Sequence, residues 1–294
     1  MNIFVTGATG FIGAAFCRLA QQHGHRVAGL IRPGKPPPRE SGETMIWLEG
    51  RLDQIPQAAL EQFQPEVCVH AAWISKPGEY LESPLNDQHL YWSEALVQRL
   101  FGLGLKHFVG VGTCLEYAPG QSALREDVSP TAATTAYARC KNAFRQSLFA
   151  SATRAGVSAC WGRVFYPYGP GEHPARLCTS LVHKFRLGEK LILKTPRSTK
   201  DYIYVADLAA AMVTTVACGV KGVINWGTGH GTSVRQIADT VAGMMDCPEL
   251  VEEISPAPPD PLGYVVADAA RLRSLGWQPQ VDLPTGIKRL LATL

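Results

Sequence analysis

The segment "VTGATGFIGAAF" (residues 5–16) constrains the fold more than any other part of the chain. Gly7, Gly10 and Gly13 directly follow a short apolar run and open a stretch of helical composition. Glycines at this spacing permit a tight turn and let the backbone approach a pyrophosphate, which rests on the helix N-terminus. A lone glycine pattern also serves ordinary turns, but here strand, turn and helix follow in the required order. The segment therefore predicts a dinucleotide-binding site.

Short apolar runs alternate with helical segments through the first two thirds of the chain. The helical segments include residues 11–23 and 89–103. The apolar runs cover residues 3–7, 26–31, 67–72, 107–112 and 158–165. Strands that are apolar on both faces and separated by helices are typical of a parallel sheet covered on both sides. The pattern predicts an α/β fold with a doubly wound parallel sheet.

The composition changes after residue 166, where loops become frequent and helices shorten. We therefore expect a Rossmann-type domain over residues 1–165 and a smaller C-terminal lobe that binds substrate. The segment "DYIYVADLAAAM" (201–212) resembles the first part again. We expect residues 201–220 to return to the first domain, leaving 166–200 and 221–294 for the lobe.

Composition excludes several classes of function. With 294 residues, 46% hydrophobic and 18% charged, the chain has the composition of a globular protein. A formal charge of +3 gives no reason to expect nucleic acid or a membrane surface as a partner. The eight cysteines lie at least 18 residues apart, so no CxxC metal or redox pair exists and we expect no metal. We expect a cytoplasmic protein for three reasons. The thiols are expected to be free, the first residues read as a strand and not as a signal peptide, and no apolar run is long enough to span a membrane.

The end of the second predicted strand bears on the choice of cofactor. A carboxylate there would bind the adenosine ribose of NAD, but the chain has Ile31 and Arg32, with Lys35 and Arg39 close behind. A guanidinium suits a 2′-phosphate better than a carboxylate does. We therefore favour NADP(H) over NAD(H), with the alternative that Arg32 only solvates a loop.

The stretch "TAYARCKNAF" (135–144) places Tyr137 and Lys141 four positions apart. On a helix these positions are neighbours on one face, so the two side chains can act together. The same spacing arises by chance in many helices, so other parts of the chain must decide between catalysis and coincidence.

Eight motifs follow one another along nearly the whole chain. They are "TGATGFIG" (6–13), "VHAA" (69–72), "FVGVGTCLEY" (108–117), "YARCK" (137–141), "RVFYPYGPG" (163–171), "KDYIYVADLA" (200–209), "INWGTG…SVRQIA" (224–238) and "VADAARLRSLGWQP" (266–279). In this order they resemble the extended short-chain dehydrogenase/reductase family, the group of NAD(P)-dependent nucleotide-sugar epimerases, dehydratases and reductases. The resemblance implies a Rossmann fold and an NAD(P)-dependent oxidoreductase.

The resemblance implies a catalytic set of Thr113, Tyr137 and Lys141. A tyrosine titrates near pH 10, so it is a poor base at neutrality unless a neighbouring cation favours its phenolate. Lys141 supplies that cation and also holds the nicotinamide ribose, while Thr113 orients the reacting oxygen. Tyr137 then transfers the proton as hydride passes between nicotinamide and sugar.

The resemblance also implies binding residues. Cofactor contacts are expected from Gly7, Thr9, Gly10, Phe11, Ile12, Gly13, Arg32, His70, Ala71, Ala72, Tyr137 and Lys141. Substrate contacts are expected from Thr113, Cys114, Tyr168, His173, Arg176 and Lys200. For His70 a structural role is the favoured alternative.

Departures from the family pattern reduce the number of reactions that this chain is expected to catalyse. The 4,6-dehydratases carry an acidic pair after the Ser/Thr position, and this chain has Cys114 and Leu115 instead, which disfavours dehydration. Epimerase-reductases have a cysteine at the position of Leu115, one residue after Cys114. Because one step along a strand reverses the side-chain face, we expect Cys114 to lie in the core. The alternative is that Cys114 and His173 form an acid–base pair. Lys200 replaces an arginine of the diphosphate clamp, and Arg176 is a substitute ligand.

These observations predict an NADP-dependent ketoreductase of a nucleotide-linked 4-keto-6-deoxy sugar. The alternatives are a nucleotide-sugar C4 epimerase with tightly bound NAD and a non-catalytic NAD(P)-binding sensor. A sensor has no need of Tyr137 and Lys141, which argues against it. We expect a nucleotide sugar as the small-molecule partner, neither nucleic acid nor membrane, and a homodimer.

Overall fold

The computed structural model describes residues 1–38, 44–258, 260 and 262–294, so the predicted role of Arg39 lies outside the described residues. The chain forms two compact units. Unit 1 comprises Met1–Glu116, Ala133–Arg163 and Ala209–Ile224. Unit 2 comprises Tyr117–Ala132, Val164–Leu208 and Asn225–Leu294.

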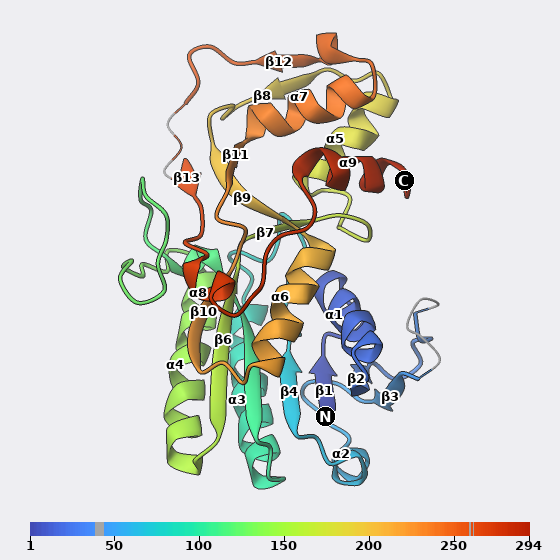
Figure 1. Ribbon diagram of the computed structural model, residues 1–294, viewed down its shortest axis with the longest axis vertical. Helices are drawn as coiled ribbons and strands as arrows, with labels where there is room; N and C mark the ends of the chain where they lie inside the picture. Colours follow the sequence, from blue (N-terminus) through green and yellow to red (C-terminus); the bar gives the residue numbers. More distant parts are fainter. Residues whose placement is uncertain (39–43, 259, 261) are drawn as a thin grey trace. The chain divides into compact units, whose positions relative to one another are not determined.

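A seven-stranded sheet with the order β10-β6-β5-β4-β1-β2-β3 is the centre of the fold (Figure 1). Its strands are β1 (Asn2–Thr6), β2 (Arg26–Ile31), β3 (Ile46–Glu49), β4 (Val67–His70), β5 (His107–Thr113), β6 (Ser158–Val164) and β10 (Gly222–Trp226). Strand β1 pairs in parallel with β2 and β4, and the pairs β2·β3 and β4·β5 are also parallel. The order reverses at β1, so the predicted doubly wound Rossmann sheet is confirmed.

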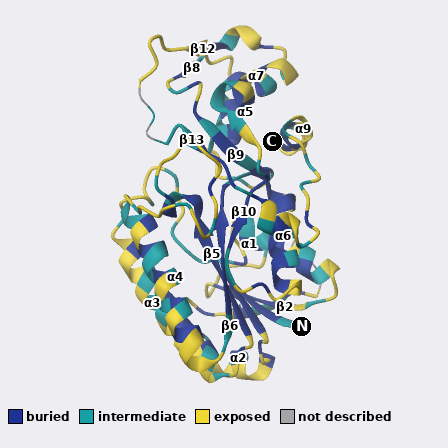
Figure 2. Ribbon diagram, turned by 60° about the vertical axis from the view of Figure 1, so that its left-hand side comes forward, coloured by how far each residue is buried: buried dark blue, intermediate teal, exposed yellow. Residues whose placement is uncertain are grey.

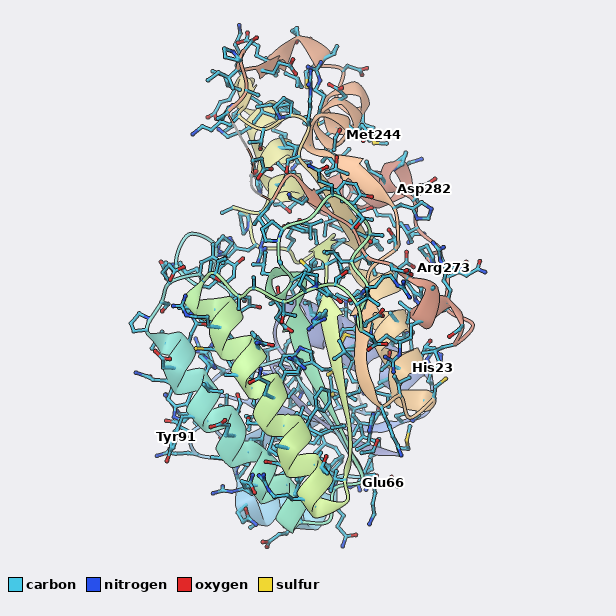
Figure 3. All side chains as sticks on the ribbon, turned by 90° about the vertical axis from the view of Figure 1, so that its left-hand side faces the viewer. His23, Glu66, Tyr91, Met244, Arg273 and Asp282 are labelled. Carbon is cyan, nitrogen blue, oxygen red and sulfur yellow. The ribbon has the colours of Figure 1, made fainter. Side chains whose placement is uncertain are left out.

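Helices cover both faces of this sheet. They are α1 (Phe11–Gln22), α2 (Gln57–Phe63), α3 (Leu85–Gly102), α4 (Ala136–Ala155) and α6 (Val205–Ala217). The strands are buried, whereas α3 and α4 turn exposed residues outward (Figure 2). Tyr91 lies on the outer side of α3 with 71% of its surface exposed (Figure 3). Between helices and sheet lies an apolar core that includes Phe4, Phe108, Phe144 and Trp161.

Helix α4, which carries the "YARCK" motif, has clear signals at both ends. Thr135 precedes it with extended backbone, and its side chain accepts a hydrogen bond from the backbone N–H of Ala138. Such a cap satisfies a backbone donor that the first turn leaves without an intrahelical partner. Gly156 ends the helix in the left-handed conformation at φ 66°, which glycine adopts without a Cβ clash. The motif therefore occupies the first turns of a well-defined helix.

Unit 2 contains a four-stranded sheet with the order β11-β9-β13, in which β7 also pairs with β9. Its strands are β7 (Tyr166–Tyr168), β9 (Thr199–Tyr204), β11 (Gly231–Ser233) and β13 (Tyr264–Val265). A second sheet pairs β8 (Leu191–Leu193) with β12 (Val251–Glu253), and the helices are α5 (Leu177–Arg186), α7 (Val234–Met244), α8 (Ala270–Arg273) and α9 (Leu283–Leu291). Apolar side chains of α5, α7 and α9 form one core with residues of β7–β9.

A buried carboxylate joins three segments of unit 2. Asp201 of β9 accepts hydrogen bonds from the backbone N–H groups of Thr228, Gly229 and Ala267 and from the hydroxyl of Thr228, at 2.6–3.2 Å. Burial raises the pKa of Asp201, whereas these four donors favour the charged form. A carboxylate with this many donors has a structural role, which accounts for the aspartate of the "KDYIYV" motif.

The structure differs from the sequence analysis in three places. Strand β3 and helix α2 were not expected, because the runs that form them are short. Residues 117–132 fall in unit 2, inside the range predicted for the first domain. The segment expected to return to the first domain is divided, since β9 joins the small sheet whereas residues 209–224 belong to unit 1. Among the described residues, no helix has the length and hydrophobicity needed to cross a membrane.

Candidate active site

The glycine turn between β1 and α1 is built by close backbone contacts. Gly7 has φ 71°, and a Cβ atom there would lie 2.7 Å from the backbone nitrogen of Ala72. A Cβ atom on Gly13 would lie 2.1 Å from the carbonyl oxygen of Gly7. Because distances below 3 Å are not tolerated, both positions require glycine. The turn therefore packs tightly against α1 and against the backbone that follows β4.

The N-terminus of α1 fits the phosphates of a dinucleotide. Gly10 is the residue before the helix, and no side chain caps the N–H groups of the first turn. Thr9 and Gly10 are exposed, and Phe11 and Ile12 are half-buried. Backbone N–H groups without side-chain partners at a helix N-terminus attract anions. The residues predicted to contact the cofactor lie together in this turn and at the start of α1, and their cofactor contacts stay a prediction: Gly7, Thr9, Gly10, Phe11, Ile12 and Gly13.

The end of β2 has a basic residue beside an acidic one on the next strand. Ile31 is buried and ends the strand, and the side chain of Arg32 is exposed. In the parallel pairing of β2 and β3, Glu49 is the register partner of Ile31. Parallel strands end at the same sheet edge, so a carboxylate does lie at this edge, on β3 instead of β2.

His70 is the last residue of β4, and both nitrogens of its ring have partners inside unit 1. Its Nδ1 lies 2.7 Å from the hydroxyl of Thr6, and its Nε2 lies 2.9 Å from the hydroxyl of Ser93. Burial, then the nearby Lys141 and His89, lower its pKa well below the usual value, so the ring stays neutral. These partners favour the structural role expected for His70, and its cofactor contact stays a prediction. Ala71 and Ala72, which follow it, lie against the glycine turn.

The three predicted catalytic residues lie in unit 1. Thr113 is the last residue of β5 and is 7% exposed. Tyr137 and Lys141 lie one turn apart at the start of α4, and the Nζ of Lys141 is 5.9 Å from the centre of the Tyr137 ring. The Tyr137 ring also packs edge-on against Tyr80 at 4.8 Å between centroids. The predicted pair therefore shares one helix face.

Lys141 is buried in an aromatic environment. Its ammonium donates to the carbonyl oxygen of Val111 at 2.7 Å and lies 4.1 Å from the centre of the Trp73 ring. Burial lowers its pKa to about 7, although the carboxylate of Glu116 raises it in part. A buried lysine whose pKa is shifted this far by its surroundings is typical of functional sites.

A buried cluster that was not predicted from the sequence surrounds Glu116, next to Thr113. Glu116 is fully buried and accepts hydrogen bonds from the backbone N–H of Thr113, the indole N–H of Trp161 and the Nε of Arg163. The available signal was one charged residue within each of two apolar runs, "TCLEY" and "CWGRVF". Charged residues inside apolar runs indicate a buried pair, because isolated buried charges are costly.

Cys114 lies in a short 3-10 helix (η1, Cys114–Glu116) and is buried. The argument from strand alternation does not apply to it, because β5 ends one residue earlier at Thr113. Its burial nevertheless agrees with a position in the core.

Two residues predicted to contact substrate lie in the interior of unit 2. Tyr168 is 2% exposed, and its hydroxyl packs against Gly286, where a Cβ atom would lie 2.2 Å away. Lys200 is 7% exposed, donates to the carbonyl oxygen of Leu262 and lies 3.8 Å from a carboxylate oxygen of Asp260. Both side chains hold unit 2 together, so we leave them out of the proposed substrate contacts.

The other two predicted substrate residues belong to the loop before α5. The Nδ1 of His173, an exposed residue, accepts a hydrogen bond from the backbone N–H of Ala175, and Arg176 is the half-buried residue before the helix. Glu172 in the same loop was not singled out from the sequence. Burial raises its pKa to about 7, and the hydroxyl of Thr179 donates to its carboxylate at 3.1 Å.

Comparisons with known proteins match this chain to UDP-glucose 4-epimerases over nearly its whole length. The chain is 27% identical over 312 residues to a UDP-glucose 4-epimerase of Corynebacterium glutamicum, covering 97% of this chain and 93% of that protein. A UDP-glucose 4-epimerase of Mycolicibacterium smegmatis is 28% identical over 309 residues, covering 98% and 97%. The crystal structure of Thermus thermophilus UDP-glucose 4-epimerase in complex with NAD superposes with a TM-score of 0.87.

That crystal structure is 23% identical and covers 100% of this chain and 98% of its own, so it shows a shared fold. Its bound cofactor gives no support to the preference for NADP(H) expected from Arg32. The model of the NAD dependent epimerase/dehydratase family matches residues 3–227. This range includes the glycine turn, Thr113, Tyr137 and Lys141, and it covers more than half of the chain. The chain belongs to the NAD dependent epimerase/dehydratase family.

Proposed function

We propose that this protein is an NAD-dependent nucleotide-sugar epimerase that inverts the sugar at C4. The observation that carries the proposal is the placement of Tyr137 and Lys141 on one face of α4, in the unit that holds the glycine turn. Relatives matched over nearly their whole length are UDP-glucose 4-epimerases, which supports a UDP-hexose as substrate. This proposal replaces the ketoreductase that the sequence analysis ranked first.

In the proposed reaction each catalytic side chain has one task. The glycine turn and the N-terminus of α1 would hold NAD, which would supply reversible hydride transfer at the sugar carbon. Tyr137 removes the proton from the sugar hydroxyl and later gives it back, as a general base and then a general acid. The ammonium of Lys141 stabilises the phenolate form of Tyr137, and the hydroxyl of Thr113 hydrogen-bonds the reacting oxygen.

The residues of unit 1 also support NAD as the cofactor. Glu49, at the end of β3, places a carboxylate at the sheet edge where the adenosine ribose is expected. Arg32 is the observation that favours the second candidate, an NADP-dependent ketoreductase, because a guanidinium suits a 2′-phosphate. The substrate contacts that we propose are Thr113 and Arg176, with His173 in the same loop as Arg176.

One labelling experiment separates the two candidates. The purified protein is incubated with UDP-glucose deuterated at C4, and products are followed by NMR. An epimerase converts the substrate to UDP-galactose, keeps the deuterium at C4 and accumulates no reduced cofactor. The same assay is run with GDP- and dTDP-hexoses to cover other nucleotides. A protein that interconverts none of these epimers, but consumes NADPH in proportion to an added nucleotide 4-keto sugar, is the reductase.

A homodimer stays a prediction for this chain. Sedimentation velocity of the purified protein measures its mass in solution, and a single species of about 32 kDa would contradict the dimer, since the chain has a mass of 31.9 kDa.

A further inference from the structure

A buried carboxylate lies directly behind the predicted catalytic threonine. Glu116 ends the 3-10 helix η1 and has no exposed surface. Its Oε1 accepts a hydrogen bond from the backbone N–H of Thr113 at 3.0 Å, and its two oxygens lie 2.9 and 3.1 Å from the indole nitrogen of Trp161. The carboxylate thus fixes the point at which β5 ends.

Two guanidinium groups compensate the negative charge of Glu116. The Nε of Arg163, on β6, lies 2.9 Å from Oε2, and the side chain of Arg163 is 2% exposed. The Nε of Arg145, on α4, lies 3.9 Å from the same oxygen. A buried ion pair of this kind carries a large desolvation penalty, so it is weak evidence for a purely stabilising role.

The backbone of β5 is shaped to admit this cluster. A Cβ atom on Gly112 would lie 2.2 Å from the indole nitrogen of Trp161 and 2.7 Å from Oε1 of Glu116. A Cβ atom on Gly110 would lie 2.4 Å from the same indole ring. Two glycines two residues apart on a strand face the same side, so both leave room for Trp161 and the carboxylate.

Lys141 contacts the same end of β5. Its ammonium donates to the carbonyl oxygen of Val111, whereas Glu116 accepts from the N–H of Thr113 two residues later. The ring of Trp161 connects the two groups, since its indole N–H binds Glu116 and its ring centre lies 6.0 Å from the Nζ of Lys141. Cation and carboxylate therefore both bind the backbone of one short segment of β5, residues 111–113.

We propose that Glu116 is a positioning residue of the active site, whose carboxylate holds Thr113 in place and supplies the counter-charge that keeps Lys141 an ammonium. The proposal rests on the proposed catalytic role of Thr113, Tyr137 and Lys141. Glu116 touches none of the reacting groups and acts through two residues that do.

Electrostatics supports this assignment. Burial lowers the pKa of Lys141 to about 7, and Glu116 is the group that opposes this shift. The other titratable and charged groups around Lys141 and Glu116 come from four elements: Tyr137 and Arg145 on α4, His70 on β4, His89 on α3 and Arg163 on β6. Burial, followed by the charge of Lys141, lowers the pKa values of both histidines, so both are neutral at pH 7. Glu116 is thus the anion in this set that favours the charged lysine.

The direct test is to titrate Lys141 in the cofactor-free protein. The Cε carbon of Lys141 is observed by NMR after labelling lysine with ¹³C, and its signal is assigned with Lys141→Arg. In the wild type we expect a midpoint near pH 7. E116Q keeps the shape and an acceptor for the N–H of Thr113 but removes the charge, so the midpoint moves to lower pH.

Glu126→Gln is the matched control. Glu126 is a partly buried glutamate of unit 2 that accepts a hydrogen bond from the backbone N–H of Asn225 at 2.9 Å. Its replacement is expected to leave the titration of Lys141 unchanged. Equal midpoints in wild type and E116Q would overturn the proposal.

A double variant keeps the test decisive if E116Q does not fold, because E116Q leaves Arg163 buried opposite a neutral amide. E116Q/R163M removes both charges, and replacing a buried ion pair by neutral groups is often tolerated. Loss of the Arg163 cation alone would raise the pKa of Lys141. A lower midpoint in the double variant can therefore come only from the loss of Glu116, and an equal or higher midpoint contradicts the proposal.

Kinetics add a second measurement. If Lys141 must be charged, the high-pH limb of kcat/KM moves to lower pH in E116Q, and Glu116→Asp, which retains the charge, restores much of the limb. A mutation that only loosens the fold would lower activity at every pH without moving the limb. The titration does not depend on activity, so it tests the electrostatic role of Glu116 separately from catalysis. If the Lys141 midpoint falls in E116Q but Lys141→Met remains active, the catalytic assignment of Lys141 is wrong. The electrostatic effect of Glu116 on Lys141 is then still supported.

Discussion

The structure brings together the predicted catalytic residues of unit 1, whereas it separates the predicted substrate residues of unit 2. Tyr137 and Lys141 share a helix face, and Lys141 donates to the carbonyl oxygen of Val111 on β5, the strand that ends at Thr113. In unit 2 the predicted set is split, with Tyr168 and Lys200 in the interior and the remaining two on a loop. Residues placed by helix pitch and strand ends are predictable from spacing, whereas residues placed by tertiary packing are not.

The largest expected effect tests this contrast with two tyrosines. Tyr137→Phe is expected to lower turnover by roughly 10²–10⁴, the contribution of a general acid–base group, while folding and cofactor binding stay near normal. Tyr168→Phe is the matched control, since its hydroxyl lies 3.5 Å from the carbonyl oxygen of Asp282 in the core of unit 2. We expect this variant to retain most of its turnover. Steady-state rates of both variants against wild type decide the point, and similar losses in both would erase the contrast.

The burial of Lys141 is expected to cost stability. Its pKa falls from 10.5 to about 7 in the folded protein, so between these values the unfolded chain binds more protons. Stability from this group therefore rises as pH increases from about 7 to 10.5, and the penalty is complete below pH 7. Lys141→Met removes this penalty but also the bond to Val111, so we expect a net gain of roughly 1–3 kcal/mol at pH 6.

Urea denaturation between pH 6 and 10 measures this effect. The exposed Lys106 of the same unit provides the control variant Lys106→Met, which we expect to follow the wild-type curve. If Lys141→Met is no more stable than wild type at pH 6, burial of the charged lysine does not lower the free energy of unfolding, and the prediction is wrong.

Much of the fold followed from the sequence, because it depends on local patterns. The glycine turn, the alternation of apolar runs with helices and the order of the motifs predicted the doubly wound sheet and the family. Helix α4 was predictable as well, since a threonine cap and a glycine at its end are local signals. Strand β3 and helix α2 are short, and short elements are stabilised by the sheet they join more than by their own composition.

The cluster around Glu116 shows why the rest was not predicted. Glu116 and Trp161 are 45 residues apart in sequence, and they meet only because β5 and β6 are neighbours. Lys200 shows the same limit, since its partner Leu262 is 62 residues away and the motif alone suggested a phosphate ligand. The sequence can mark such charged residues as unusual, but their partners depend on the tertiary structure.

A smaller effect separates the two basic residues of unit 2. Arg176→Ala is expected to raise KM for the nucleotide sugar by roughly 10–100-fold, since charge-assisted hydrogen bonds contribute about 1.5–3 kcal/mol. Lys200→Met is expected to affect stability instead, lowering the melting temperature because it leaves Asp260 and the carbonyl of Leu262 without this donor. Kinetics and thermal melts of both variants measure the difference. If Lys200→Met raises KM and leaves the melting temperature unchanged, Lys200 binds substrate as the sequence predicted.

The smallest expected effect concerns Arg32, the residue that would favour binding of NADP over NAD. Arg32 is exposed directly after β2, and exposed charges contribute about 0–1 kcal/mol. If NAD is the cofactor, Arg32→Ala changes its dissociation constant by less than about fivefold, because no 2′-phosphate is present to be bound. Isothermal titration calorimetry with NAD and NADP on wild type and variant tests this directly. Tight NADP binding that is lost in Arg32→Ala, with NAD binding unchanged, would show that Arg32 reads the 2′-phosphate. That outcome would favour the ketoreductase over the epimerase, because a reductase draws on the NADPH pool whereas an epimerase returns its hydride to the same sugar.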